Sequence, residues 1–174
     1  MSKDFTVVSE GTVEGNTQNS GGPWTWNSLW CVNGSTLTYS SILVSYTIPI
    51  RYNGELFFDL IHTYDFQVSA LVALDGGNVS ISRNSGKFTL VSFTSNGYNL
   101  MISPFSSNPL AGQPVFSGNS GGTSTPAKII SSTSLGVCTV NDTIILKFNA
   151  GWNDMGLLRP SPNWMLHQIK LYSQ

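Results

Sequence analysis

The amino-acid sequence predicts an all-β protein, an antiparallel two-sheet β-sandwich of jelly-roll type. Most periodic stretches alternate apolar and polar residues, which is the pattern of half-buried strands. No stretch combines a helical period with a helix cap, and 17 Gly and 8 Pro interrupt the chain at short intervals. Short strands separated by turns are typical of sandwiches and barrels. We therefore expect the 174 residues to form a single jelly-roll domain, residues 1–174.

The expected strands follow one another along the whole chain. The first covers residues 42–50, where Ile42, Val44, Tyr46, Ile48 and Ile50 alternate with other residues. The second covers 56–62 and places Leu56, Phe58, Leu60 and His62 on one face. Further strands are expected at 67–74, 79–82, 88–93, 143–148 and 164–172, with turns at 51–54, 75–78 and 84–86. The stretches 11–31 and 103–126 lack a strand pattern, so we expect ordered loops there.

The composition excludes several classes of partner. Charged residues make up 10% of the chain, the formal net charge is −1, and the pI is near 6.0. A nucleic-acid-binding surface needs a basic stripe to replace the counterions of the phosphates, so no nucleic-acid partner is expected. No apolar run approaches the ~18 residues of a membrane span, and we expect no membrane insertion.

The N-terminus and the cysteines bear on the compartment. Residues 1–5 contain no apolar segment of the kind found in secretory signals. Either the chain is a mature fragment that carries an initiator Met, or the protein reaches its destination without the secretory route, as virion proteins released by lysis do. We expect an extracellular or virion-surface protein with no signal peptide in this chain. Cys31 and Cys138 lie far apart in sequence, and they either pair across the sandwich or are two buried free thiols.

Five segments carry a family resemblance: 75–82 (DGGNVSIS), 97–99 (GYN), 108–118 (NPLAGQPVFSG), 146–154 (LKFNAGWND) and 162–169 (PNWMLHQI). They resemble the MAM-like jelly-roll modules appended to secreted bacterial proteins, such as metalloproteases of the immune inhibitor A type. The resemblance spans residues 56–172 and implies a two-sheet jelly roll that recognises or spaces, while catalysis belongs to other domains. The family's last strand commonly carries acidic residues after its Trp that can serve a structural calcium. Here Met165, His167 and Gln168 occupy those places.

The residues offer little catalytic chemistry. His62 lies on an apolar strand face, where a structural role is expected. Glycoside cleavage would need two carboxylates ~5–10 Å apart across a cleft. Asp59 and Asp65 are close in sequence, but their places on a strand and at its end favour structural hydrogen bonds. We expect no catalytic residues and no enzymatic activity.

A structural calcium ion is the cofactor that the sequence can support. The oxygen donors in loops or at strand ends are Glu14, Asn16, Asp65, Asp75, Asn153 and Asp154. Jelly rolls often clamp the N-terminal segment to the last loops with one ion, which would bring Glu14 and Asp154 together as ligands. The alternative is that these side chains serve turns, as Asp75 does most simply.

The most informative binding signal is aromatic. Trp24, Trp26 and Trp30 crowd the Gly-, Asn- and Ser-rich segment 21–30, and Tyr98 adds a weaker signal nearer the second long loop. An exposed ring can stack on the apolar face of a sugar while Asn and Ser side chains bond its hydroxyls. The alternative is that the indoles seal the open end of the sandwich. The sequence thus predicts ligand contacts at these four residues, with a glycan or cell-surface polymer as the partner.

Two functions follow from these observations. The first is a non-catalytic recognition or attachment module that binds glycans or a cell-surface polymer. The second is a structural protein of a virion or surface assembly: a capsid, capsid-decorating or fibre jelly roll that forms a homo-oligomer or joins a viral assembly. Within residues 2–10 the only basic residue is Lys3, so a decorating or attachment role fits better than a shell that contacts a genome.

Overall fold

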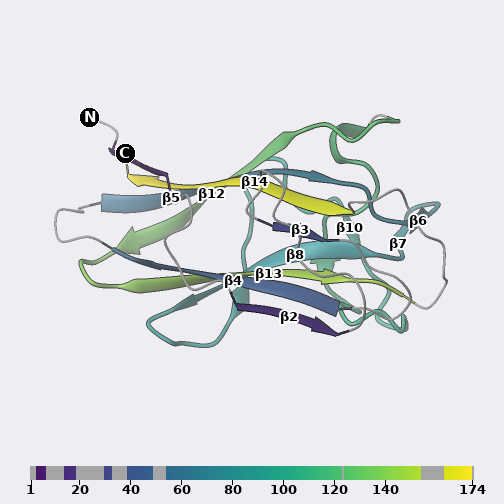
Figure 1. The fold of residues 1–174 in the computed structure, drawn as a ribbon, viewed down its shortest axis with the longest axis horizontal. Helices are drawn as coiled ribbons and strands as arrows, with labels where there is room; N and C mark the ends of the chain where they lie inside the picture. The colour runs from purple at the N-terminus through teal and green to yellow at the C-terminus, as the bar shows by residue number, and fades with distance from the viewer. Residues whose placement is uncertain are drawn as a thin grey trace.

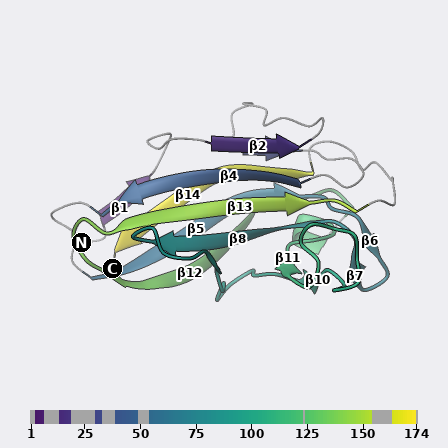
Figure 2. The same ribbon diagram turned by 90° about the horizontal axis from the view of Figure 1, so that it is seen from below.

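The computed structural model of the protein describes residues 3–6, 14–18, 30–32, 39–48, 54–122, 124–153 and 163–173. These residues form two antiparallel β-sheets of five strands each, packed face to face (Figure 1 and Figure 2). The first sheet has the order β1 (Lys3–Thr6), β14 (Trp164–Ser173), β5 (Gly54–Tyr64) and β12 (Ile129–Cys138), and β3 (Trp30–Val32) also pairs with β14. The second sheet has the order β2 (Glu14–Gln18), β4 (Tyr39–Thr47), β13 (Thr143–Gly151), β8 (Gly76–Arg83) and β9 (Thr89–Leu90).

Smaller elements lie between β5 and β12. Two short hairpins are formed by β6 (Val68–Ser69) with β7 (Val72–Ala73) and by β10 (Leu100–Met101) with β11 (Pro114–Val115). A 3₁₀ turn, η1 (Ser120–Gly122), precedes β12. No helix in the described parts of the chain is long and apolar enough to cross a membrane.

The strand order confirms the predicted jelly-roll sandwich. From β4 onward the chain crosses to the other sheet after each long strand: β4 lies in the second sheet, β5 in the first and β8 in the second. It then passes to β12 in the first sheet, β13 in the second and β14 in the first. From β4 onward, the long strands that are neighbours within a sheet are therefore not consecutive in sequence, which is the arrangement of a jelly roll.

The core fills the space between the two sheets, and strand alternation decides which side chains enter it. Leu56, Phe58, Leu60 and His62 of β5 are all fully buried, as the sequence predicts. Ile42 of β4 and Phe148 of β13 lie opposite each other and face the same core. A shift of one residue in either register would turn these side chains to the solvent, so the apolar pattern fixes the pairing.

The tryptophan of the last strand lies at the centre of this core. Trp164 is fully buried and packs against Phe66, Phe116 and Phe148, with ring centroids 6.1–6.3 Å apart. It lies close against Gly77, where an added Cβ would come within 2.5 Å of the indole ring. The second glycine of the sequence Asp-Gly-Gly at 75–77 is therefore required by packing.

Several sequence expectations about strands were wrong. The stretch 11–31, expected to be a loop, contains β2 and the start of β3, and the expected loop 103–126 contains β11. Residues 76–78, expected to lie in a turn, begin β8. Residues 67–74 do not form one strand, because Ala70 has a left-handed φ of 53° and the chain reverses between β6 and β7. Strand β12 was missed, because its buried positions are polar. The buried Ser131 donates to the carbonyl of Asn96, and the buried Thr133 donates to the carbonyl of Ser92.

The strand register excludes a disulfide between the two cysteines. Cys138 is a free, buried thiol opposite Gly54, at one end of β5. Cys31 lies opposite Met165, which pairs with Thr63 near the other end of β5. A strand rises ~3.3 Å per residue, so these positions are roughly 30 Å apart, whereas a disulfide needs Cα atoms within ~7 Å. Burial raises the pKa of the Cys138 thiol.

Candidate functional site

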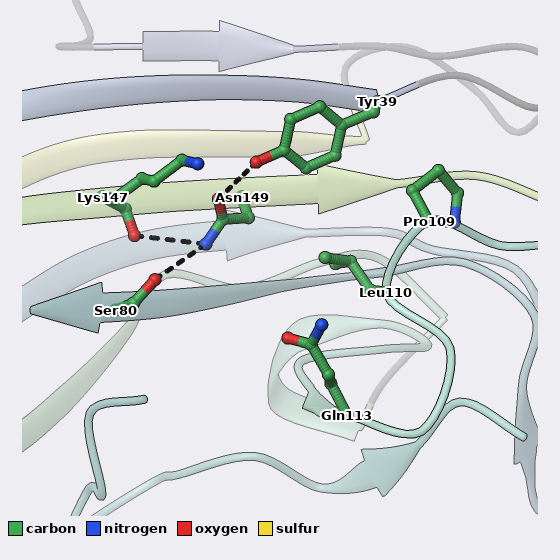
Figure 3. Close-up of a pocket in the computed structure, with 7 residues that line it drawn as sticks. All are labelled: Tyr39, Ser80, Pro109, Leu110, Gln113, Lys147 and Asn149. Atoms are coloured by element: carbon green, nitrogen blue, oxygen red, sulfur yellow. Dashed lines mark hydrogen bonds between the residues drawn. The ribbon is translucent and has the colours of Figure 1, made fainter. Parts of the chain in front are cut away.

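A pocket of about 510 Å³ opens on the outer face of the second sheet (Figure 3). Strands β4, β8 and β13 form its floor, and the chain between β10 and β11 forms one wall. The described residues that line it are Tyr39, Ser80, Pro109, Leu110, Gln113, Lys147 and Asn149. We take this pocket as the candidate functional site.

Strand alternation explains why polar side chains gather on this floor. In β13, the apolar side chains Leu146, Phe148 and Ala150 enter the core, so Lys147 and Asn149 point outward. Ser80 of β8 lies directly opposite Lys147. The register of three strands thus places residues from distant parts of the sequence side by side.

Asn149 is the centre of a hydrogen-bond network on the floor (Figure 3). The Tyr39 hydroxyl donates to Asn149 Oδ1 at 2.7 Å. Asn149 Nδ2 donates to Asn78 Oδ1 at 3.0 Å and to Ser80 Oγ at 3.1 Å. Asn78 in turn donates to Gln113 Oε1 at 2.9 Å. These bonds fix the orientation of the amides and connect the sheet to the loop wall.

The loop wall is held in place by Asn108, the first residue of the Asn-Pro-Leu-Ala-Gly segment. Asn108 is buried, and its Nδ2 donates to the carbonyls of Leu74 at 2.8 Å and Gly151 at 2.9 Å. Its Oδ1 accepts the amide of Leu110 at 2.8 Å. A Cβ on Gly151 would lie 2.5 Å from Asn108 Oδ1. The segment that carries part of the family resemblance therefore builds one wall of the pocket.

Lys147 gives the pocket its charge. Its Nζ lies 5.7 Å from the ring centroid of Tyr39 and 5.8 Å from that of Phe88, within the range of cation–π contacts. None of the described lining residues is acidic, and none is a histidine or a cysteine. The site combines one ammonium group, amides, a hydroxyl and a phenol ring.

Tyr98, a predicted ligand contact, packs against the core. Its hydroxyl donates to the carbonyl of Val79 and accepts the amide of Val79, both at 3.0 Å. Its ring lies against Phe93 and Phe116, with centroids 5.5 and 4.8 Å away. Burial raises the pKa of Tyr98. This environment is that of a structural residue, and Tyr98 is not among the residues that line the pocket.

The predicted tryptophan contacts are placed only in part. Trp24 and Trp26 lie outside the described residues. Trp30 begins β3, and its backbone pairs with Leu166 in the first sheet, whereas the pocket lies on the second. Ligand contact by these three residues stays a prediction.

The predicted calcium ligands are likewise placed only in part. Glu14 begins β2, where its backbone lies opposite Leu43 of β4, and Asp154 lies outside the described residues. Across the described ranges, no group of three or more His, Cys, Asp and Glu side chains could hold a metal ion. Calcium binding by Glu14 and Asp154 stays a prediction.

His62 has the structural environment that the sequence predicts. Its Nδ1 accepts a hydrogen bond from the indole N–H of Trp164 at 3.1 Å, and since that indole can only donate, the ring proton is on Nε2. Nε2 then donates to Ser131 Oγ at 2.9 Å. Burial, followed by the charge of His167, lowers the pKa of His62 to about 3. The residue is neutral, enclosed and outside the pocket.

The sequence analysis did not predict the role of Asn149 at this pocket. Asn149 stands at an outward position within a strand whose inward positions are apolar, and it is 6% exposed. A polar residue that is nearly buried on the outer face of a sheet must be covered by another part of the chain. Its hydrogen-bond partner Tyr39 is 110 positions away in sequence, so no local sequence pattern predicts that the two residues are in contact.

No family model matches the chain, and no curated protein matches it. The resemblance to MAM-like modules is therefore not supported by a family match, while the β-sandwich class that it implies is confirmed.

Several solved structures share parts of the architecture. A tailspike domain of bacteriophage CBA120 is 11% identical, with a TM-score of 0.42, and the match covers 98% of this chain and 19% of that one. CBM35 from Cellvibrio japonicus Abf62 is 9% identical, with a TM-score of 0.39, over 98% of this chain and 92% of that one. The Agl-KA catalytic domain is 11% identical, with a TM-score of 0.36, and the match covers 92% of this chain and 26% of that one. At these identities and TM-scores, the matches assign neither a family nor a function.

Proposed function

We propose that the protein is a non-catalytic glycan-binding module and that its ligand occupies the pocket on the outer face of the second sheet. The observation that carries this proposal is the network around Asn149, which presents fixed, neutral hydrogen-bonding groups next to the Tyr39 ring. Such a module acts outside the cell or on the surface of a virion.

The chemistry of the pocket suits a sugar. A saccharide hydroxyl both donates and accepts hydrogen bonds, and amide and hydroxyl side chains do the same. Because the bonds of Asn149 and Asn78 hold these groups before a ligand arrives, little side-chain entropy is lost on binding. The partly buried ring of Tyr39 adds an apolar surface for the C–H groups of a sugar.

The same set of groups favours binding over catalysis. General acid–base work needs a group that titrates near the operating pH, most often a histidine or a carboxyl. None of the described lining residues is acidic or a histidine, and Ser80 Oγ accepts a hydrogen bond from the Asn149 amide. We therefore propose that the module carries out no reaction of its own.

A glycan array followed by titration calorimetry tests the proposal. Asn149→Ala and Ser80→Ala remove the centre and one edge of the network, and we expect the first to weaken binding of an array hit by about tenfold or more. Ser92→Ala changes an exposed serine outside the pocket lining and is the control. Equal affinity in all three variants would place the ligand elsewhere on the molecule.

One observation favours the second function, a virion or surface-assembly protein. Ala73 and Ile102 form a parallel bridge with both side chains buried, so Val72 and Met101 face the other way, 45% and 57% exposed. Leu71, at the turn, is 85% exposed. Exposed apolar patches of this kind occur at contacts between subunits. The absolute mass in solution by light scattering tests this alternative, which requires a defined multimer.

A further inference from the structure

The next inference rests on the proposed function and names the chemical class of the ligand. We propose that the pocket selects glycans that carry an anionic substituent, and that Lys147 is the residue that recognises the charge. The ammonium group lies at the edge of the neutral network, so an anion bound to it would place the rest of the sugar over Asn149 and Ser80.

The first argument is the position of the ammonium group. A lysine side chain on a strand surface is usually free to extend into water. Here Nζ of Lys147 lies within 6 Å of the ring centroids of both Tyr39 and Phe88. Tyr39 is the first residue of β4, and Phe88 directly precedes β9. Two aromatic rings attract the same cation and limit where it can go. The two rings therefore keep the ammonium group of Lys147 at the pocket.

The second argument is the lack of a competing negative charge among the described residues that line the pocket. Strand β4 contains no charged residue, and the charged residues of β8 and β13 are Arg83 and Lys147. The stretch from 88 to 127, which includes the loop wall, contains no charged residue. Glu14, at the backbone position opposite Leu43, is two strands away from Lys147. A cation that no pocket carboxylate neutralises attracts anions from solution.

The third argument concerns the size of the ligand. Phe88 is 44% exposed and does not line the pocket, yet its ring lies beside the same ammonium group. The aromatic surface thus continues from Tyr39 past Lys147 to the turn before β9. One basic side chain, Lys147, among the described lining residues suits a sugar with one anionic group per binding site. It does not suit the repeated phosphates of a nucleic acid, which need several basic side chains.

The experiment compares polymers that differ in charge alone. Polygalacturonate is compared with its methyl ester, and dextran sulfate with dextran, so that carboxylate and sulfate are distinguished. Each polymer is immobilised, and the protein of 174 residues is titrated over it by biolayer interferometry at 50 and 500 mM NaCl. The variants are Lys147→Met, Lys147→Arg and Lys170→Met. Lys170 is the matched control, since it lies opposite Asp59 in the first sheet.

We expect the unaltered protein to bind at least one charged polymer about tenfold or more tightly than its neutral partner. Lys147→Met should bring that ratio close to one, while Lys147→Arg and Lys170→Met should preserve it. The ratio should also fall at the higher salt concentration. Circular dichroism of each variant confirms that the fold is retained.

Two results would overturn the inference, and they separate it from the proposed function. If the neutral polymers bind as tightly as the charged ones, or Lys147→Met keeps the charge preference, then Lys147 does not recognise the ligand, although glycan binding stands. If no polymer binds and the glycan array is also empty, both the inference and the proposed function fail.

Discussion

Two polar networks in this sandwich are built from similar groups and differ in one respect. The network around His62 lies between the sheets, and His62, Ser131 and Trp164 are all fully buried. The network around Asn149 lies on the outer face of the second sheet and borders the pocket. The first is closed on all sides by protein, whereas the second opens to solvent through Ser80, Tyr39 and Lys147.

This difference separates a structural role from a binding role. In a closed network each donor already has an acceptor in the protein, so the bonds specify the packing of the core. In an open network the same bonds fix the orientation of groups whose remaining lone pairs and protons face the pocket. Buried polar residues on strands are therefore informative about function only when the network that they form reaches the surface.

The largest expected effect is on the closed network. His62→Ala should lower the free energy of unfolding by about 3 kcal/mol or more, because it leaves a cavity beside Phe116 and removes the acceptor of the Trp164 indole. Urea denaturation measures this loss. Asn149→Ala should cost only about 1 kcal/mol, since water in the pocket can replace the lost partners. Equal losses in the two variants would show that the two networks do not differ in closure.

The closed network also makes stability depend on pH. The pKa of His62 is lowered by burial from the usual 6.5 to about 3, so between these values the unfolded chain binds a proton that the folded one does not. Stability is complete above pH 6.5 and should fall by about 1.4 kcal/mol for each pH unit below it. Thermal or urea unfolding between pH 7 and 5 measures the slope, before the carboxylates titrate.

His62→Gln is the control for that slope, because the amide can replace both hydrogen bonds without titrating. Burial also lowers the pKa of the half-buried His167, which acts in the same direction, so His167→Gln is measured in parallel. If the fall in stability with pH persists in His62→Gln and disappears in His167→Gln, then His167 rather than His62 causes the pH dependence.

The sandwich could be predicted from the sequence because its strands carry an apolar alternation. The pattern at 56–62 places four side chains in the core, and the structure agrees. The same reasoning failed for β12, whose buried Ser131 and Thr133 bond to the neighbouring segment rather than pack as apolar groups. A pattern of apolar residues cannot reveal a strand whose inward face is polar.

The candidate site could be predicted less well, because it depends on which strands become neighbours. Asn149 and Asn78 are ordinary strand residues until the register of β13 and β8 places them side by side. Asn108 belongs to a segment that the sequence singles out, but its role as the clamp of the loop is evident only from its bonds to Leu74 and Gly151. Of the three crowded tryptophans, the described residues include Trp30, whose backbone pairs with Leu166 in the first sheet.

The finest test of the comparison uses two tyrosines, one in each kind of environment. Tyr98→Phe leaves the amide of Val79 without its acceptor inside the protein and should cost about 1 kcal/mol or more of stability, with glycan affinity unchanged. Tyr39→Phe leaves Asn149 Oδ1 facing the pocket, where water replaces the phenol, so it should cost about 0.5 kcal/mol. The affinity of Tyr39→Phe for the ligand should fall several-fold, because one of the hydrogen bonds that orient the Asn149 amide is lost. Urea denaturation and calorimetry on the same preparations measure both quantities. If instead Tyr98→Phe weakens binding while Tyr39→Phe does not, the ligand contact predicted for Tyr98 from the sequence is favoured over the pocket.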